Sequence, residues 1–437
     1  MREQISMKAK PSPKTKKNSF DSLPKKQQAL LRNANKRAKD CSREGKYEEA
    51  LKACLQAVRI LPQLAPAWLD ASVNSIRLER WEDGIRYAEK AMALGSNAFT
   101  VYDALSHAHT ALGNKDLRTK YGCMALESRE KIFGLEPPFP HDFPSKLPPP
   151  PSPETRHKNL IAFSLFGAHS RYCETAVLNA KERKELYPHW TCRFYLDETV
   201  PSHVVRRLAE AEAEIVLLDD KHPAKTWPGP MWRLYALQDD LDRVTFRDAD
   251  SVITQRDAMA TEAWVESGRF FHAMRDSGTH TELLLAGLWG CVVKALPPLS
   301  MMLKAFFEKP LESLHFADQY FLRSFVWPYA RKSILQHDSI FGFFNAEPFP
   351  DGPTPATFHV GWNEGGTRFS VKTDAPDGTP LHWALHLLEE GGEIHVCTYP
   401  GVAQGGMLFG QIPDRYARRI LEKTAGIRII SPENEAS

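Results

Sequence analysis

The sequence predicts an α/β domain with a Rossmann-like, mostly parallel sheet, preceded by an all-α domain built from helical repeats. Three observations lead to this fold class. Helical apolar patterns recur with a 34-residue period before residue 134. Nine prolines then lie between Leu135 and Glu154, and beyond them short apolar strands alternate with helices. Such alternation is typical of a parallel sheet covered by helices.

Length and composition place the chain among soluble globular proteins. With 437 residues, two or three domains are expected, and 42% apolar and 25% charged residues are ordinary values. The net charge of +2 does not indicate a nucleic-acid partner. The basic segment 1–22 lacks an apolar core, so we expect a disordered tail rather than a signal peptide. No apolar run is long enough for a membrane span, and seven scattered cysteines indicate a reducing, cytoplasmic location.

The repeats occupy the predicted domain 23–134. Gly45 and Gly113 lie two periods apart, and alanines recur at the same phase at Ala57, Ala91 and Ala125. The segments 31–64, 65–98 and 99–132 therefore resemble three tetratricopeptide repeats, although a plain helical bundle stays open. Stacked repeats present a concave surface. We expect this surface to bind a protein or peptide partner, with self-association as the alternative.

The proline-rich segment 135–156 is expected to be a semi-rigid linker, because proline at this density prevents helix and central-strand formation. The domain 157–350 follows. Strands are expected at 160–166, 192–196, 214–218 and 244–246, and helices at 172–186, 202–211 and 231–243. The C-terminal extension 351–437 is expected to pack on this domain, with a helix at 380–390, a strand at 393–397 and a final helix at 413–425.

The most informative motif is Arg247-Asp248-Ala249-Asp250-Ser251, directly after a predicted strand. Ligands of α/β proteins bind beyond the carboxyl ends of strands. Two carboxylates at that edge suit Mg²⁺ or Mn²⁺, which shares the oxygens of a diphosphate. Such an ion would stabilise a departing nucleotide diphosphate.

This motif belongs to an ordered series between Asn159 and about Pro350 that resembles bacterial glycosyltransferases of the GT-A type. The series comprises Phe163–Gly167, Thr191–Asp197, the acidic motif, Phe271–Asp276, Gly287–Gly290, Ala317–Gln319 and His337–Ser339. The resemblance implies a metal-dependent hexosyltransferase that uses a nucleotide-diphospho-sugar as donor.

The resemblance also implies a metal site and an acceptor side. Asp250 is expected to bind the metal directly, Asp248 to hold the ribose or a metal-bound water, and His337 to supply the remaining ligand. For His337 an ordinary strand-end histidine is the alternative. Arg275 and Asp276 resemble the catalytic wall on the acceptor side, where Asp276 acts as a base or merely orients Arg275.

Further residues are expected to contact the donor, each with a structural alternative. Ser164 and Phe166 end the first strand, and Arg247 would pair with the diphosphate or with a helix acid. Trp289 would stack on the sugar or lie in the core. The pair Asp318 and Gln319 would bind sugar hydroxyls or cap a helix.

The acceptor is expected to be a protein or peptide recruited by the repeats, with a saccharide or lipid-linked acceptor as the alternative. A non-catalytic repeat scaffold with a degenerate transferase domain is the rival function. Glycoside hydrolysis is disfavoured, because Asp248 and Asp250 are too close in sequence to flank a sugar. Phosphate-binding, dinucleotide-binding, serine-hydrolase and zinc motifs do not occur.

Overall fold

The computed structural model describes residues 20–311, 313–352 and 358–430. Residues 1–19 of the predicted basic tail lie outside this part. The chain divides into two compact units between Ser128 and Arg129, and each is described by itself. None of the described helices has the length and hydropathy needed to cross a membrane.

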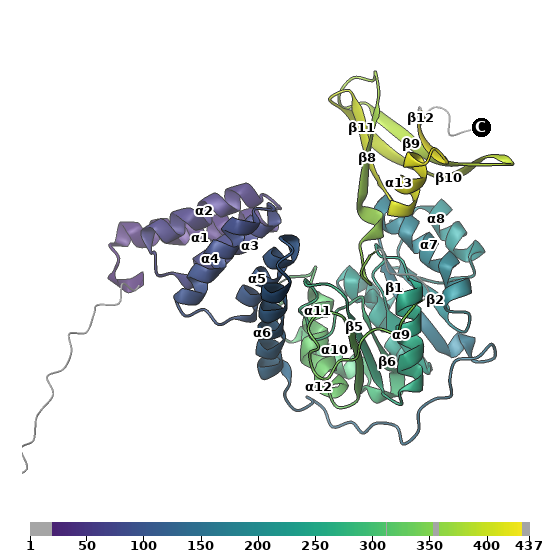
Figure 1. Ribbon diagram of the computed structural model, residues 1–437, viewed down its shortest axis with the longest axis horizontal. Coiled ribbons are helices and arrows are strands. Elements are labelled where there is room, and N and C mark those ends of the chain that lie inside the picture. The colour runs from purple at the N-terminus through teal and green to yellow at the C-terminus, as the bar shows by residue number, and fades with distance from the viewer. Residues whose placement is uncertain (1–19, 312, 353–357, 431–437) are drawn as a thin grey trace, which may run out of the picture. The chain divides into compact units, whose positions relative to one another are not determined.

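The first unit is a series of antiparallel helices with tetratricopeptide-like pairing (Figure 1). The helices are α1 (Lys25–Arg43), α2 (Tyr47–Ile60), α3 (Ala65–Arg77), α4 (Trp81–Ala93), α5 (Phe99–Ala111) and α6 (Lys115–Phe133). Ala57, Ala91 and Ala125 are each 0% exposed. Small side chains at this phase let neighbouring helices approach closely, as the sequence period predicted.

Gly84 and Arg118 lie at the phase of Ala50 in the second and third repeats. At Gly84, an added Cβ would lie 2.8 Å from Ile76 Cγ1, so the glycine is needed for close packing of α4 on α3. The Ser72 hydroxyl donates to the Gly84 carbonyl oxygen at 2.7 Å. One period later, the Ser106 hydroxyl donates to the Arg118 carbonyl oxygen at 3.1 Å. The same hydroxyl bond thus joins the two helices of the second and third repeats.

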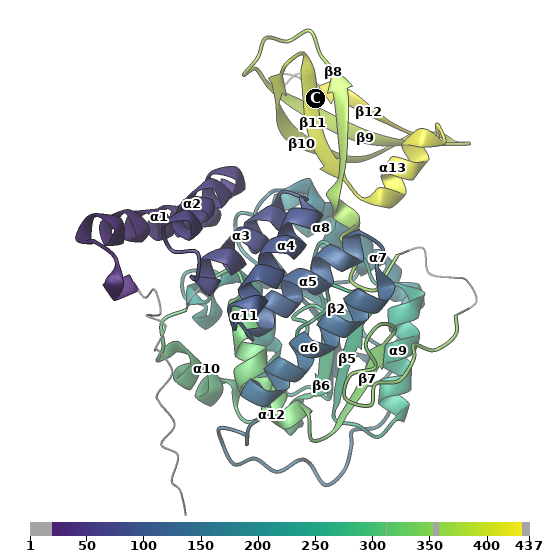
Figure 2. The ribbon, with the colours of Figure 1, turned by 60° about the vertical axis from the view of Figure 1, so that its left-hand side comes forward.

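The second unit contains a seven-stranded sheet in the order β3-β2-β1-β4-β6-β5-β7 (Figures 1 and 2). Its strands are β1 (Asn159–Leu165), β2 (Thr191–Leu196), β3 (Glu214–Leu217), β4 (Arg243–Phe246), β5 (Phe271–Arg275), β6 (Trp289–Val292) and β7 (Ile334–Asp338). Only β6 among them runs antiparallel to its neighbours. The sequence prediction of an α/β domain with a mostly parallel sheet is therefore confirmed.

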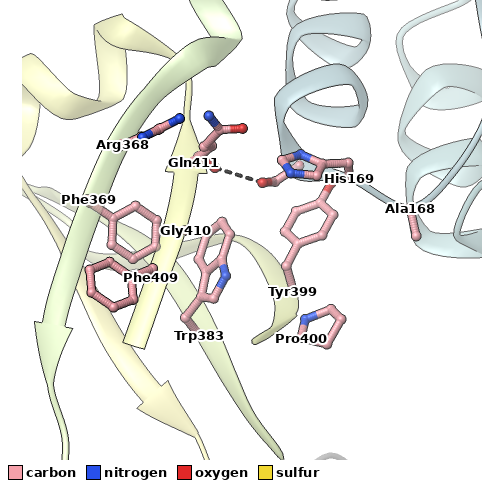
Figure 3. Close-up of a pocket in the computed structure, with 11 residues that line it drawn as sticks. Ala168, His169, Arg368, Phe369, Trp383, Tyr399, Pro400, Phe409, Gly410 and Gln411 are labelled. Carbon is pink, nitrogen blue, oxygen red and sulfur yellow. Dashed lines mark hydrogen bonds between the residues drawn. The ribbon is translucent and has the colours of Figure 1, made fainter. Parts of the chain in front are cut away.

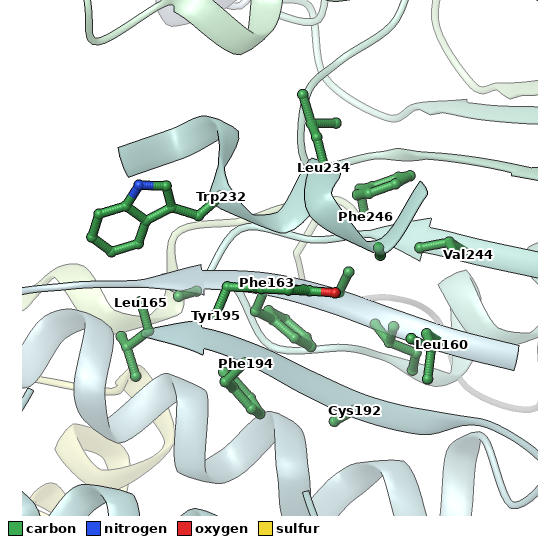
Figure 4. Close-up of a cluster of buried hydrophobic side chains, with 14 of the residues drawn as sticks. Leu160, Phe163, Leu165, Cys192, Phe194, Tyr195, Trp232, Leu234, Val244 and Phe246 are labelled. Carbon is green, nitrogen blue, oxygen red and sulfur yellow. The ribbon is translucent and has the colours of Figure 1, made fainter. Parts of the chain in front are cut away.

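Helices and short turns connect these strands. They are α7 (Ser170–Leu186), α8 (Ser202–Glu210), α9 (Gln255–Glu266), α10 (Leu299–Phe307), α11 (Ala317–Phe321) and α12 (Trp327–Ala330). The predicted helix 231–243 is wrong in type: Gly229–Gln238 forms successive 3-10 turns. These turns pack on β1 and β4, and Figure 4 shows Trp232 and Leu234 beside the buried side chains of the strands. Phe163 and Phe194, register partners in β1 and β2, stack there with ring centroids 4.7 Å apart.

The proline-rich segment lies along the second unit and is held by specific hydrogen bonds. The Arg243 guanidinium, buried in β4, donates to the carbonyl oxygens of Pro148 at 2.8 Å and Pro149 at 2.7 Å. The Tyr329 hydroxyl donates to the Phe139 carbonyl oxygen at 2.8 Å. These bonds explain a charged residue at the start of a buried strand, because its buried N–H groups all need acceptors. The acceptors are carbonyl oxygens of a segment whose prolines prevent it from forming a helix or a sheet of its own.

The C-terminal extension forms an antiparallel sheet in the order β12-β9-β10-β11-β8. Its elements are β8 (Thr367–Lys372), β9 (Pro380–Glu389), β10 (Gly392–Gln404), β11 (Met407–Ile412), α13 (Asp414–Leu421) and β12 (Ala425–Ile430). The predicted helix 380–390 is wrong, because β9 is paired with β10 on one side and β12 on the other. Two ladders of backbone hydrogen bonds outweigh the helix propensity of its leucines and glutamates.

Candidate functional site

A cavity of about 460 Å³ opens at the carboxyl ends of β1 and β4. The strand order places β2 and β3 on one side of β1 and the remaining strands on the other. The connections therefore reverse direction between β1 and β4, and such a switch point is where open α/β sheets bind ligands. The side chains that line it include Ser164, Phe166, Arg171, Tyr172, Arg233, Asp248, Asp250, His280, His315, Phe316, Asp318 and Gln319.

The two acids of the motif both face this cavity, and each has an arginine partner. The Asp250 carboxylate accepts from Arg171 at 2.6 Å, and the Asp248 carboxylate accepts from Arg233 at 2.7 Å. Burial, and secondly the charge of Asp248, raise the pKa of Asp250. At Gly287, an added Cβ would lie 2.1 Å from Asp248 Oδ2, so the glycine leaves the room that this carboxylate occupies. The acids are thus crowded together at the cavity wall.

Arg233 organises this wall from inside the protein. Its guanidinium donates to the carboxylates of Asp248 at 2.7 Å and Asp318 at 2.9 Å, and to the Arg247 carbonyl oxygen at 2.6 Å. Its backbone N–H donates to the Ser164 hydroxyl at 2.9 Å. The local sequence Met-Trp-Arg-Leu-Tyr buries this arginine, and a buried guanidinium requires anionic partners. An arginine alone in an apolar stretch is the sequence signal that could have indicated this role.

Gln319 lines the cavity, but its side-chain amide forms hydrogen bonds with the neighbouring loop. Its amide oxygen accepts from the Ala286 N–H at 3.1 Å, and its amide nitrogen donates to the Leu284 carbonyl oxygen. Phe166 is 45% exposed, and its ring meets Trp232 edge-on at 5.4 Å. Of the predicted donor residues, Ser164, Phe166, Asp248, Asp318 and Gln319 are therefore brought together around one cavity.

Arg247 and Trp289, two other predicted donor residues, lie elsewhere. The Arg247 side chain is 2% exposed and points toward Asp257, at 3.9 Å. Trp289 is 0% exposed and stacks on Phe246 at 4.3 Å in the core. Successive residues of an extended chain point to opposite sides. Arg247 therefore points away from the side that carries Asp248.

His337 does not join the acids, so the prediction that it completes their metal site is wrong. It lies on β7, three strands from β4, or about 14 Å at ordinary strand spacing. Its Nδ1 shares a hydrogen bond of 2.9 Å with Nε2 of the buried His272. Burial, with Arg256 nearby, lowers the pKa of His337 to about 4. Within the described ranges, no three His, Cys, Asp or Glu side chains are placed to hold a metal together.

Arg275 and Asp276, the predicted catalytic pair, support the site from behind. The buried Arg275 guanidinium donates to the carbonyl oxygens of Glu282 and Leu283, at the start of the loop that lines the cavity. Asp276 accepts two hydrogen bonds from Arg256, at 3.1 and 3.0 Å, and one from the Val360 N–H at 2.9 Å. With its oxygens occupied, Asp276 is a poor base, and neither residue lines the cavity.

Several lining residues were missed by the sequence analysis. Arg171 and Tyr172 lie in the first turn of α7, directly after the loop that follows β1, where the fold alone could have placed them. His280 lies beyond Asp276, and burial, together with His359 and Arg275, lowers its pKa to about 3. His280 is therefore neutral near pH 7. His315 and Phe316 lie before α11 without any local signal.

Comparison with known proteins identifies no family. No protein-family model and no curated protein matches this chain. Among solved structures, the chain is similar to the TPR2B domain of yeast Sti1 in complex with pHsp70, at 15% identity and a TM-score of 0.23 over 24% of this chain and 83% of that one. It is also similar to the MamA protein, at 13% identity and a TM-score of 0.23, over 24% of this chain and 57% of that one.

A third similarity covers a larger share of the chain. A mutant O-GlcNAc transferase from Thermobaculum terrenum matches at 14% identity and a TM-score of 0.31, over 58% of this chain and 55% of that one. The chain therefore spans about half the length of that transferase.

Proposed function

We propose that the cavity between β1 and β4 binds a nucleotide-diphospho-sugar and that the protein transfers its sugar to an acceptor. The observation that carries this proposal is the position of Asp248 and Asp250. They lie beyond the end of β4 at the switch point of the sheet, facing a cavity of about 460 Å³. Arg171 lies beside them, and its cationic side chain suits a diphosphate. A single mixed sheet bearing the acidic motif is consistent with a GT-A-type domain.

The residues present fit a divalent cation in part. Two carboxylates lie on one wall, and the charge of Asp248 contributes to the raised pKa of Asp250, a repulsion that a cation would relieve. We propose that Asp250 and Asp248 hold Mg²⁺ or Mn²⁺, with diphosphate and water oxygens in place of the predicted histidine. When bound, such an ion would neutralise charge on the departing nucleotide diphosphate.

The protein's own side chains would position the donor and exclude water. Arg233 holds Asp248 and Asp318 in place, and Gln319 fixes the loop around Leu284 and Ala286. His315 lines the cavity and replaces Asp276 as the candidate to accept an acceptor proton. His280 accepts from the Asp276 N–H at Nδ1, at 3.1 Å, so its neutral ring would donate a hydrogen bond from Nε2. The rival function, a repeat scaffold with a degenerate transferase domain, would show donor binding without transfer or hydrolysis.

The first unit supports a second part of the proposal. Stacked helical pairs with a concave surface commonly bind extended or helical peptides. We propose that they recruit a protein or peptide, either as acceptor or as its carrier, while self-association of the repeats is the alternative. Recruitment by a linked domain raises the local concentration of a weakly recognised acceptor.

Calorimetric titration with uridine and guanosine diphospho-sugars in the presence of Mn²⁺ tests the donor site. We expect saturable binding that EDTA abolishes, and Asp250→Asn should weaken it by roughly 10–100-fold, as loss of groups around a metal commonly does. Asp240→Asn, at a side chain that is 76% exposed, is the matched control and should bind normally. Absence of binding by every donor would refute the proposal, and metal-independent binding would refute the cation.

A further inference from the structure

A second cavity, of about 530 Å³, lies where the C-terminal sheet meets the start of α7 (Figure 3). One side is formed by the β1–α7 loop and the other by β8 to β11. The lining residues are Ala168, His169, Ser170, Arg368, Phe369, Trp383, Tyr399, Pro400, Phe409, Gly410 and Gln411. Its volume is within the range of small-molecule sites. It is separate from the donor cavity, since the two share no lining residue.

The cavity exists because β10 and β11 separate. They pair only at Ala403–Leu408 and Gln404–Met407, next to their turn. Farther from the turn, Tyr399 and Pro400 lie on one wall and Phe409 to Gln411 on the other.

Two hydrogen bonds fix these walls to the α/β domain. The Ser170 hydroxyl donates to the Gln411 carbonyl oxygen at 2.7 Å. The Tyr399 hydroxyl donates to the buried carboxylate of Glu174 at 2.7 Å. Glu174 also accepts from Arg207 at 2.7 and 2.9 Å, so this end of the sheet is anchored to both α7 and α8. The cavity is therefore built in advance and needs no rearrangement to exist.

The lining combines aromatic rings with polar side chains at the mouth. Phe369, Trp383 and Tyr399 form an aromatic group, with ring centroids 4.9 and 5.3 Å apart in succession. Trp383 and Tyr399 are only 1% and 3% exposed, so the rings that a ligand can cover are those of Phe369 and Phe409. Phe409 is 54% exposed at the mouth. Arg368 and Gln411 are register partners in β8 and β11, and His169 lies across from them (Figure 3).

A saccharide matches this combination. A pyranose presents C–H groups on its faces, which aromatic ring faces attract, and hydroxyls around its edge. The hydroxyls both donate and accept hydrogen bonds, as guanidinium, amide and imidazole groups require. Arg368 is the one lysine or arginine of this lining, whereas a neighbouring groove carries Lys181, Lys184 and Arg206. Neutral and acidic saccharides therefore both match the site.

The position of the cavity supports a role in transfer. Phe166 lines the donor cavity and Ala168 lines the second one. Their Cα atoms are at most about 7 Å apart, because a single residue separates them. Arg171 and Ser170, adjacent in α7, likewise line one cavity each. The two cavities therefore adjoin the same loop, the one between β1 and α7.

We propose that this aromatic cavity binds an oligosaccharide, as the acceptor or as the growing end of an acceptor chain. The assignment as acceptor rests on the proposed transferase function, whereas oligosaccharide binding itself does not. A neighbouring groove of about 1210 Å³ shares Ala168, Tyr399 and Pro400 with the cavity. The occupant therefore has room for more than one sugar ring.

Binding is tested on the full chain, without donor, by calorimetry and saturation-transfer NMR. The probes are cellohexaose, maltohexaose, chitohexaose and hexagalacturonic acid. We expect at least one to bind saturably, with Phe409→Ala weakening it at least tenfold. Phe307→Ala, at a 40% exposed phenylalanine of α10 outside both cavities, is the matched control and should bind normally. Arg368→Ala, at an exposed position of β8, is a second variant with the same expected loss.

The outcomes separate the two proposals. Donor titration of Phe409→Ala should match the wild-type protein, because Phe409 does not line the donor cavity. Oligosaccharide binding without donor binding would keep this inference and refute the transferase. Failure of all four probes, or undiminished binding by both Phe409→Ala and Arg368→Ala, would overturn it even if the donor binds. Transfer to a peptide but to none of these saccharides would overturn the assignment as acceptor.

Discussion

At the scale of single residues, the cavity between β1 and β4 depends on the buried guanidinium of Arg233. This group donates hydrogen bonds both to Asp248 after β4 and to Asp318 in α11. The sequence around Arg233 does not predict either partner. Removing one member of a buried ionic group leaves the others without compensation. The carboxylates of Asp248 and Asp318 would then repel each other at the cavity wall.

We expect Arg233→Met to lower the free energy of unfolding by about 3–5 kcal/mol and to abolish donor binding. Arg233→Lys should lose less stability but still bind donor weakly, because an ammonium cannot reproduce the paired geometry. Urea unfolding and donor titration measure the two effects. Arg206→Met, at a 72% exposed arginine of α8, should change stability by less than about 0.5 kcal/mol. A fully active Arg233→Met variant would contradict the assigned role.

The buried pair of His272 and His337 predicts how stability depends on pH. Burial lowers the pKa of His337 to about 4 and the pKa of His272 well below its ordinary value. At any pH between the folded-state pKa of these histidines and their unfolded-state pKa of about 6.5, the unfolded chain binds protons that the folded chain does not. Stability is therefore complete above about pH 6.5 and falls as the pH drops toward 4.

Each histidine should contribute up to about 1.4 kcal/mol per pH unit across that window. Urea unfolding at pH 7.5, 6.5 and 5.5 measures the slope, which should be shallower in His337→Gln. The exposed His157 offers the control, since His157→Gln should leave the slope unchanged. An unaltered slope in His337→Gln would show that this pair does not govern the pH dependence.

At the scale of elements, the repeats carry a turn that recurs with the same backbone conformation. Gly45, Glu79 and Gly113 are spaced by the repeat period, and their φ angles are 73°, 58° and 72°. The left-handed region suits glycine and is strained for a glutamate. The second repeat therefore has a strained turn between α3 and α4.

We expect Glu79→Gly to raise the free energy of unfolding of the repeat unit by about 0.5–1 kcal/mol, since the strain outweighs the added flexibility of the unfolded chain. The reciprocal change Gly113→Glu should lower it by a similar amount. Thermal unfolding followed by circular dichroism measures both. A destabilised Glu79→Gly variant would mean that contacts of the glutamate side chain outweigh its backbone strain.

One element of the C-terminal sheet shows where the local sequence predicts the wrong secondary structure. The segment 380–389 has leucine, alanine and glutamate in a helix-like order, yet it is the strand β9, between β10 and β12. Its conformation is decided by partners that arrive later in the chain. The strands β1 and β2 were predictable because their apolar runs are buried on both faces, which is typical of parallel sheets.

At the scale of the whole molecule, the boundary between the two units lies inside α6. Residues 129–133 of this helix belong to the second unit. There Arg129 pairs with Glu282 at 3.0 Å, and the Glu130 carboxylate accepts from Arg331 at 2.8 Å and from the Trp327 indole at 2.5 Å. The predicted boundary at residue 134 would remove these contacts.

We therefore expect a chain that begins at Lys115 to be more stable than one that begins at Leu135. The difference should be about 2–4 kcal/mol, from lost hydrogen bonds to charged groups. Urea unfolding compares the two truncated chains. Equal stabilities would show that the end of α6 does not contribute to the second unit. In the longer truncated chain, intact donor hydrolysis with reduced transfer to a peptide acceptor would support recruitment by the repeats.

The sequence alone determined the repeat period, the α/β class of the second unit and the place of the acidic motif at a strand end. Each of these follows from short-range pattern. The spacing of apolar residues indicates which face of an element is buried, and glycine and proline mark where elements end. The tertiary structure decided which side chains meet. It brought Arg171, Arg233 and Asp318 to the acids, and it placed His337 and Trp289 in the core. Such meetings depend on strand order and side-chain direction across distant segments, which local pattern does not contain.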